Sequence, residues 1–69
     1  MKTFQATFVK NNRVAEGEAI ECVYHGKRRI GRVDKIFGHA FDATQLSVQT
    51  EDGFRRFNIN EIQDLVVKR

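Results

Sequence analysis

The chain contains one short pattern twice: a turn glycine, one further residue, two arginines and a large apolar residue. The first copy is His25-Gly26-Lys27-Arg28-Arg29-Ile30. The second, Asp52-Gly53-Phe54-Arg55-Arg56-Phe57, begins 27 residues later. A glycine followed by alternating residues is typical of a hairpin turn that opens into a strand. The repeat therefore predicts two similar hairpins, each with paired arginines just beyond its turn.

Apolar residues recur with a period of two along most of the chain, and the sequence contains no proline. This period indicates strands rather than helices. We expect strands at 3–8, 19–24, 28–37, 46–50 and 54–59, and a short closing strand at Val66 and Val67. Asn60 is expected to cap a short helical turn near the C-terminus. The fold class is therefore all-β: a single SH3-like or Sm-like barrel of five to six antiparallel strands formed by residues 1–69.

Local spacing adds expectations about individual strands. The first strand should bury Phe4, Ala6 and Phe8 on one face, and Phe57 and Ile59 should point inward from the fifth. Ile30 and Val33 are three residues apart, so a β-bulge at Gly31 is expected to absorb the extra residue. Turns are predicted at 10–13, 16–18, 25–27 and 51–53, and a loop at 38–43.

The length of 69 residues allows one modest core, because a domain this small buries only about 60% of its unfolded surface. Cys22 is the only cysteine, which excludes an internal disulfide and fits a reducing compartment. It alternates with Ile20 and Tyr24, as a buried core cysteine does. No apolar run approaches the ~20 residues that a membrane span needs, and the N-terminus lacks the apolar segment of a signal peptide. We therefore expect a soluble cytoplasmic protein without a membrane partner.

The residue types that carry catalysis are sparse. His25 and His39 are the only histidines, and Cys22 has no partner at metal-ligand spacing. Nothing in the pattern marks Ser47 as an activated nucleophile, and no glycine loop that could bind a phosphate precedes a helix. We expect no catalytic residue, no metal and no cofactor, so the sequence indicates that the protein is not an enzyme.

Basic side chains are the strongest functional signal, although the net charge is only +3. Guanidinium groups suit phosphates and carboxylates because they donate two parallel hydrogen bonds. Aromatic side chains beside them provide stacking surfaces for bases. The predicted nucleic-acid-binding residues are Lys27, Arg28, Arg29, Arg32, Lys35, Arg55 and Arg56, with Tyr24 and Phe54 as stacking candidates and Phe37 and Phe41 as further aromatics. A solvated strand face is the alternative interpretation of the same residues.

Strand alternation separates the two arginines of the second copy. Arg55 falls on the same side as Phe57 and Ile59, which places it either at the mouth of the barrel or in an ion pair with an acid such as Asp34 or Glu61. Arg56 points outward, which makes it the better candidate for ligand contact.

The segment Gly53-Phe54-Arg55-Arg56-Phe57-Asn58-Ile59-Asn60-Glu61-Ile62 resembles the closing segment of WYL domains and of the short WYL-like Sm-fold proteins that bacteriophages encode. Tyr24-His25-Gly26-Lys27-Arg28-Arg29 resembles an earlier strand and turn of the same family. The resemblance covers residues 18–67. It implies an SH3-like or Sm-like barrel with a regulatory role that binds nucleic acid or nucleotides, with Arg29, Arg55 and Arg56 as the carriers.

Two other functions fit the same sequence. A small phage factor could dock on a host protein or assembly and modulate it, since the surface carries both basic and acidic stretches. Strand pairing between barrels would instead give a homo-oligomer. The sequence leaves these alternatives open.

Overall fold

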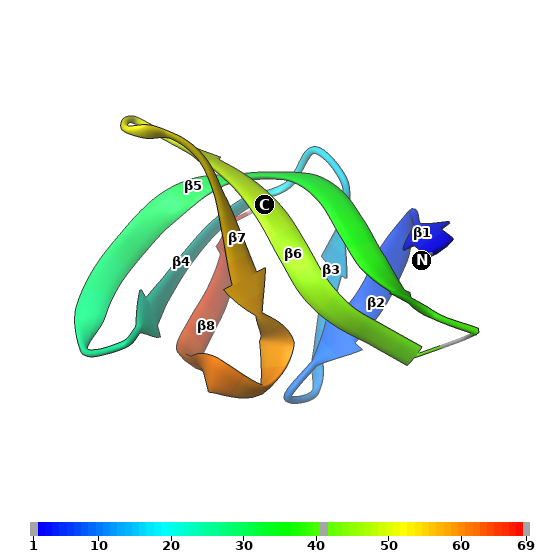
Figure 1. The fold of residues 1–69 in the computed structure, drawn as a ribbon. Helices are drawn as coiled ribbons and strands as arrows, with labels where there is room; N and C mark the ends of the chain where they lie inside the picture. The colour runs from blue at the N-terminus through cyan, green and yellow to red at the C-terminus, as the bar shows by residue number, and fades with distance from the viewer. Residues whose placement is uncertain (1, 41, 69) are drawn as a thin grey trace.

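The computed structural model describes residues 2–40 and 42–68, and most of them lie in strands (Figure 1). All strand pairs in it are antiparallel. The elements are β1 (Lys2–Phe4), β2 (Ala6–Val9), β3 (Asn12–Ala15), β4 (Ala19–Tyr24), β5 (Lys27–His39), β6 (Asp42–Thr50), β7 (Gly53–Asn58), the 3-10 turn η1 (Ile59–Glu61) and β8 (Ile62–Lys68). No helix among these residues is long and apolar enough to cross a membrane.

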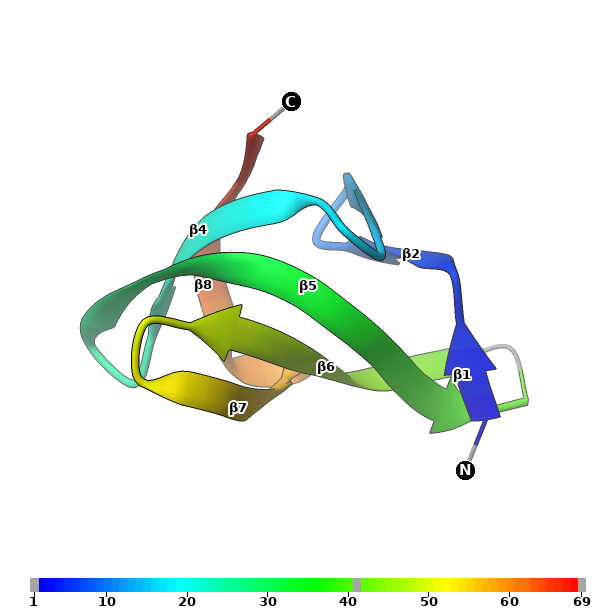
Figure 2. The same ribbon diagram turned by 90° about the horizontal axis from the view of Figure 1, so that it is seen from above.

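The main sheet has the strand order β7-β6-β5-β4-β8, and β1 pairs with the far end of β5. Strand β5 is thirteen residues long and curves through the centre of this sheet (Figures 1 and 2). Its first half pairs with β4, and its second half pairs with β6 and β1. Strands β2 and β3 form a separate hairpin. The long curved strand therefore connects all parts of the main sheet.

The hydrophobic core lies on the concave side of the sheet. Strand alternation brings every second side chain of β4, β5 and β6 to this side. Ile20, Ile36 and Leu46 are each almost fully buried, and Cys22 is buried as predicted. The remaining core residues are Val9, Val14, Val33, Val48, Phe57, Ile59, Ile62 and Leu65.

The predicted turns at 10–13, 16–18, 25–27 and 51–53 are confirmed. Lys10 and Asn11 both have positive φ, as do His25 and Gly26, which is the conformation of tight two-residue hairpin turns. The repeated glycine-arginine pattern does open two hairpins, since β4 pairs with β5 and β6 pairs with β7.

The expected closed barrel is not what the strand pairing shows. Within the part of the chain that is described, the path of paired strands ends at β7 on one side and β8 on the other. Side chains bridge part of this opening instead. The ring of Tyr24 on β4 stacks on that of Phe57 on β7 at 4.5 Å, and the Asn58 N–H donates to the Tyr24 hydroxyl at 3.1 Å. The strand count is also higher than five or six, because the N-terminal segment forms three short strands.

The predicted first strand is divided by a bend at Gln5. Because of this bend, β1 pairs with β5 whereas β2 pairs with β3. The bend also changes which side chains face the core: Val9 is fully buried, and Phe8 is 70% exposed. The prediction that Phe8 is buried was therefore wrong, because it assumed that one straight strand ran from 3 to 8.

The predicted bulge at Gly31 was also wrong. Gly31 pairs regularly with Ile20, and the irregularities of β5 against β6 lie between Val33 and Lys35 and between Phe37 and Gly38. Ile30 is consequently 58% exposed. A glycine stands at position 31 for a different reason: a Cβ there would lie 2.5 Å from the Gln49 carbonyl oxygen, so only glycine lets β6 approach this closely.

Two further expectations about segment boundaries need correction. The predicted loop at 38–43 is shorter, because β5 continues to His39 and β6 begins at Asp42; Phe41 lies outside the described residues. The helical turn lies at Ile59–Glu61, with Asn58 rather than Asn60 at its N-terminal boundary and no capping bond from the Asn58 side chain. Residues 66 and 67 do belong to a strand, β8, which starts earlier than predicted.

Candidate binding surface

The outward-facing side of β5, β6 and β7 gathers several of the predicted site residues. Val33, Ile36, Leu46, Val48 and Phe57 are buried on the concave side, so residues alternating with them point outward. Pairing aligns these outward residues in three rows. We call them the β5–β7 face, and the rows are Arg32–Gln49–Phe54, Lys35–Ser47–Arg56 and Phe37–Gln45–Asn58.

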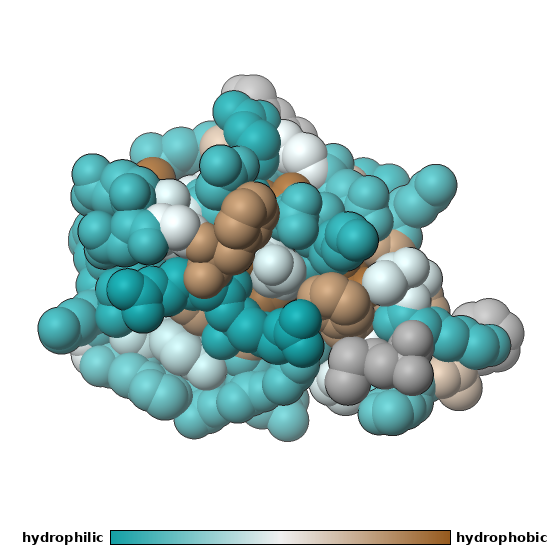
Figure 3. Space-filling view, turned by 45° about the horizontal axis from the view of Figure 1, so that its top comes forward, coloured by the Kyte–Doolittle hydropathy of each residue, from teal (hydrophilic) through white to brown (hydrophobic). Residues whose placement is uncertain are grey.

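The centre of the β5–β7 face is basic and aromatic. Lys35 and Arg56 flank Ser47 in the middle row, and neither forms an ion pair with any described residue. The guanidinium carbon of Arg56 lies 4.3 Å from the centre of the Phe37 ring, a cation–π contact that fixes the arginine against the sheet. Phe54 is 64% exposed in the neighbouring row. Figure 3 shows brown apolar groups among teal polar ones on this side of the molecule.

The uncharged polar residues of the β5–β7 face carry amide groups or, in the case of Ser47, a hydroxyl group. Gln45 donates to the Asn58 side-chain oxygen at 3.1 Å, which orders the two amides relative to each other. None of the nine residues is acidic, so the local field favours an anionic ligand.

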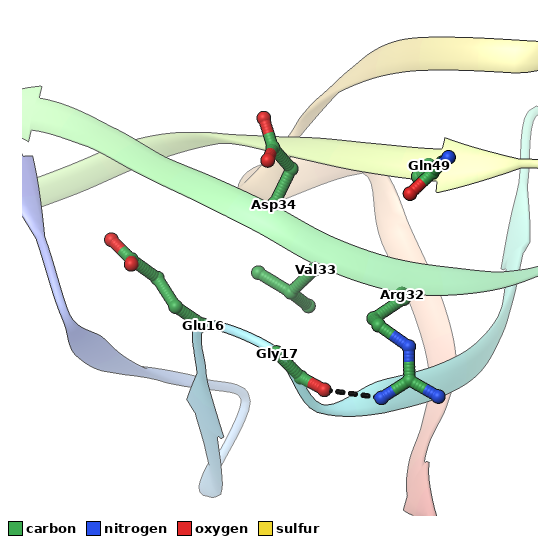
Figure 4. Close-up of a pocket in the computed structure, with 6 residues that line it drawn as sticks. All are labelled: Glu16, Gly17, Arg32, Val33, Asp34 and Gln49. Carbon is green, nitrogen blue, oxygen red and sulfur yellow. Dashed lines mark hydrogen bonds between the residues drawn. The ribbon is translucent and has the colours of Figure 1, made fainter.

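Arg32 lies at the border of the β5–β7 face, beside a cleft of about 400 Å³. Its guanidinium donates to the Gly17 carbonyl oxygen at 2.5 Å, which turns the side chain towards the loop before β4 (Figure 4). Glu16 and Asp34 also line this cleft. Arg32 is therefore held by the loop and has carboxylates nearby, so it is a weaker candidate for anion binding than Lys35 or Arg56.

The basic side chains of the first copy of the repeated pattern are less available to a ligand than Arg56 of the second copy. Arg28 forms an ion pair with Glu21, whose other carboxylate oxygen lies 3.1 Å from the Lys68 ammonium. Lys27 is exposed at the turn and pairs with Tyr24 across the hairpin. Arg28 is therefore a weaker candidate for anion binding than Lys35 or Arg56, because its charge is already paired.

Arg29 faces the core side of the sheet, because it pairs with buried Cys22. Its Nε atom is buried and has no hydrogen-bond partner among the described residues. Burial raises the pKa of the Cys22 thiol, and the nearby Arg29 charge opposes this change. The raised pKa keeps the thiol protonated, in agreement with a structural cysteine.

Arg55 pairs with Val48, which places it on the core side of β7 as predicted, yet the residue is exposed. The alternative of an ion pair with Asp34 or Glu61 is not observed within 2–40 and 42–68. Arg55 therefore lies in the middle of β7, the strand at one end of the sheet path.

Tyr24 is not a free stacking surface, because it is part of a polar contact that the sequence did not suggest. Its ring stacks on His25 at 4.2 Å as well as on Phe57. His25 Nε2 lies 2.8 Å from one Glu61 carboxylate oxygen, and the Asn58 amide donates to the other at 2.7 Å. We call Tyr24, His25, Asn58 and Glu61 the β4–η1 latch. Its members are up to 37 residues apart, and no local pattern relates them.

The hydrogen bonds of the latch change the acidity of Glu61. The Asn58 amide and then His25 stabilise the carboxylate and hold the pKa of Glu61 below its ordinary value of 4.5. This arrangement joins the β4–β5 turn to the end of β7. In the described part of the chain, no group of three His, Cys, Asp or Glu side chains could hold a metal ion.

No protein-family model matches the chain, and no curated protein or solved structure matches it. The structure therefore defines the protein as a small antiparallel all-β chain with a basic and aromatic outer face, and the resemblance to WYL-like and Sm-like proteins stays an expectation from the sequence.

Proposed function

We propose that this protein is a non-enzymatic binding module that takes single-stranded nucleic acid or a nucleotide on the β5–β7 face. One observation carries the proposal: Lys35 and Arg56 lie in one row, aromatic rings lie in the two flanking rows, and the nine residues include no acid. Cations bind phosphate groups, and an exposed ring such as Phe54 stacks on a base. Unpaired bases are needed for this contact, which favours single strands over duplexes.

We propose an SH3-like barrel that stays open between β7 and β8 as the finer description of the fold. The strand order β7-β6-β5-β4-β8 places the η1 turn between the two outermost strands of the path. The β4–η1 latch draws these ends together through side chains. A regulatory role and a cytoplasmic location, as expected for a WYL-like protein of the kind encoded by bacteriophages, belong to the same proposal.

The predicted cations contribute unequally in this proposal. Lys35 and Arg56 are the main contacts because no described acid neutralises them, and Arg32 extends the surface at its border. Arg29 and Arg55 lie on the other side of the sheet and would reach only a ligand that continues around the open edge. Arg28 contributes least, since it is paired with Glu21.

Fluorescence anisotropy with a labelled ten-nucleotide oligo(dT) or oligo(U) tests this function. Arg56→Ala and Lys35→Ala should each weaken binding and make the dependence on salt less steep by about one phosphate contact, whereas Phe54→Ala should weaken binding by roughly 1–3 kcal/mol without changing that dependence. Arg28→Ala is the matched control, because it removes an arginine that is already paired.

Two outcomes would contradict the proposal. One is the absence of any anisotropy change at low salt. The other is an equal loss of affinity in Arg28→Ala and Arg56→Ala, which would show that net charge, rather than the β5–β7 face, determines binding.

A further inference from the structure

Strand β7 has an unpaired backbone edge over part of its length. It is the terminal strand of the main sheet, and β6 is the only strand that pairs with it in the described chain. At its C-terminal end the Asn58 N–H donates to the Tyr24 hydroxyl, so that position is occupied. In the described part of the chain, the backbone groups of Phe54 and Arg56 on this side have no such partner, and Figure 2 shows no strand beyond β7 there.

The direction of the Asn58 N–H identifies the free groups on this edge. Amides at alternate positions of a strand point to the same side, so the N–H and C=O groups of Phe54 and Arg56 point away from β6 as that of Asn58 does. A strand that pairs along this edge would find two N–H donors and two C=O acceptors. Main-chain groups of this kind are the basis of strand addition to a sheet.

The side chains along this edge restrict which strand can bind. Arg56 on the outward side and Arg55 on the core side are both exposed, and neither has an ion-pair partner among the described residues. A second copy pairing through β7 would bring the arginines of both chains together, and like charges opposite each other destabilise a strand pair. An acidic strand would instead find cations on both of its faces and the exposed Phe54 ring beside them.

We propose that the β7 edge, from Gly53 to Arg56, binds an extended acidic segment of a partner protein by strand addition. The partner segment carries acids on both faces of its strand, next to Arg55 and Arg56, and an apolar residue next to Phe54. This interaction shares the Arg56 and Phe54 side chains with nucleic-acid binding, but it also requires the backbone edge of β7, which nucleic-acid binding does not use.

Synthetic peptides test the inference directly. The probe is the hexapeptide TVEEVT, in three forms: unmodified, N-methylated at the alternate amides of one phase, and N-methylated at those of the other. Titrations followed by amide NMR signals should show the largest shifts at Phe54 and Arg56. Methylation of the phase that faces β7 should weaken binding at least tenfold, and methylation of the opposite phase should change it less than twofold, because only one phase donates to the edge.

Variants of the protein separate backbone pairing from charge. Arg56→Pro removes the edge N–H together with the charge, and Arg56→Ala removes the charge alone, so peptide binding should be weaker in Arg56→Pro. Oligonucleotide binding should respond equally to both variants. Equal effects of the two methylation phases, no shifts at millimolar peptide, or a mass by light scattering of twice the 8.0 kDa chain would overturn the inference, the last because it would show that the chain pairs with itself.

Discussion

At the scale of single residues, the strand opposite an arginine decides whether the arginine is available. Arg28 and Arg55 occupy the same place in the two copies of the repeated pattern. Arg28 lies beside β4, which supplies Glu21 as an ion-pair partner. Arg55 pairs with Val48 on β6, is exposed and forms no ion pair with a described residue. The two similar stretches of sequence therefore differ in how many of their arginines lack an ion-pair partner. This difference comes from the strands with which they pair.

Gly31 provides a test at the same scale. We expect Gly31→Ala to lower the free energy of unfolding by roughly 1–3 kcal/mol, because its Cβ would lie 2.5 Å from the Gln49 carbonyl oxygen and 2.7 Å from Val48 Cγ1. The first of these atoms belongs to backbone, so β5 and β6 must move apart. Urea unfolding of Gly31→Ala and of the exposed control Lys27→Ala measures the effect. Equal midpoints would show that the close approach of the two strands is not required.

At the scale of the elements, tight turns set the hairpins. The β2–β3 turn has positive φ at Lys10 and Asn11, and the β4–β5 turn has it at His25 and Gly26. Asparagine and glycine adopt this conformation at little cost, which is why sequence signals located both turns. The turns also determine the register of the strands that follow, including the strand that carries the first pair of arginines.

A pair of substitutions at Asn11 tests the β2–β3 turn. Asn11→Gly should keep or raise the melting temperature, whereas Asn11→Val should lower the free energy of unfolding by about 1–2 kcal/mol, since a β-branched residue is strained at positive φ. Thermal unfolding of the two variants beside the parent protein measures this difference. A more stable Asn11→Val protein would be incompatible with the observed turn.

At the scale of the whole molecule, side-chain contacts hold together the parts of the sheet that strand pairing does not connect. The sheet path ends at β7 and β8, and the β4–η1 latch connects the β4–β5 turn to the segment between these two strands. Tyr24 has a central position in it, since its ring stacks on Phe57 and its hydroxyl accepts from Asn58. The overall shape therefore depends on contacts between residues that are far apart in the chain.

The latch predicts how stability changes with pH. Because the pKa of Glu61 is lower in the folded protein than its ordinary value of 4.5, ionised Glu61 stabilises the fold above that pH. This contribution is lost as the pH falls through the lowered pKa. Glu61→Gln should therefore reduce stability at pH 7 and make the decrease between pH 5 and pH 3 shallower. Urea unfolding at several pH values checks this, with the turn variant Glu51→Gln as the control. Parallel pH profiles for all three proteins would contradict the role of the latch.

The sequence by itself determined the features that depend on neighbours along the chain. Alternation and turn residues located β4 (Ala19–Tyr24), the two hairpins of the repeated pattern and the outward direction of Arg56, because side-chain direction in a strand follows from its period of two. The same rules failed at Phe8 and Gly31, where a bend and a close approach of strands come from tertiary contacts.

Only the tertiary structure decided which of the repeated arginines are free, that the sheet path stays open, and that Tyr24, His25, Asn58 and Glu61 meet. Each of these features depends on which distant strands or turns lie side by side. Pairing partners are selected by the packing of the whole sheet, and a repeated local pattern such as Gly-x-Arg-Arg carries no information about the residues that will face it.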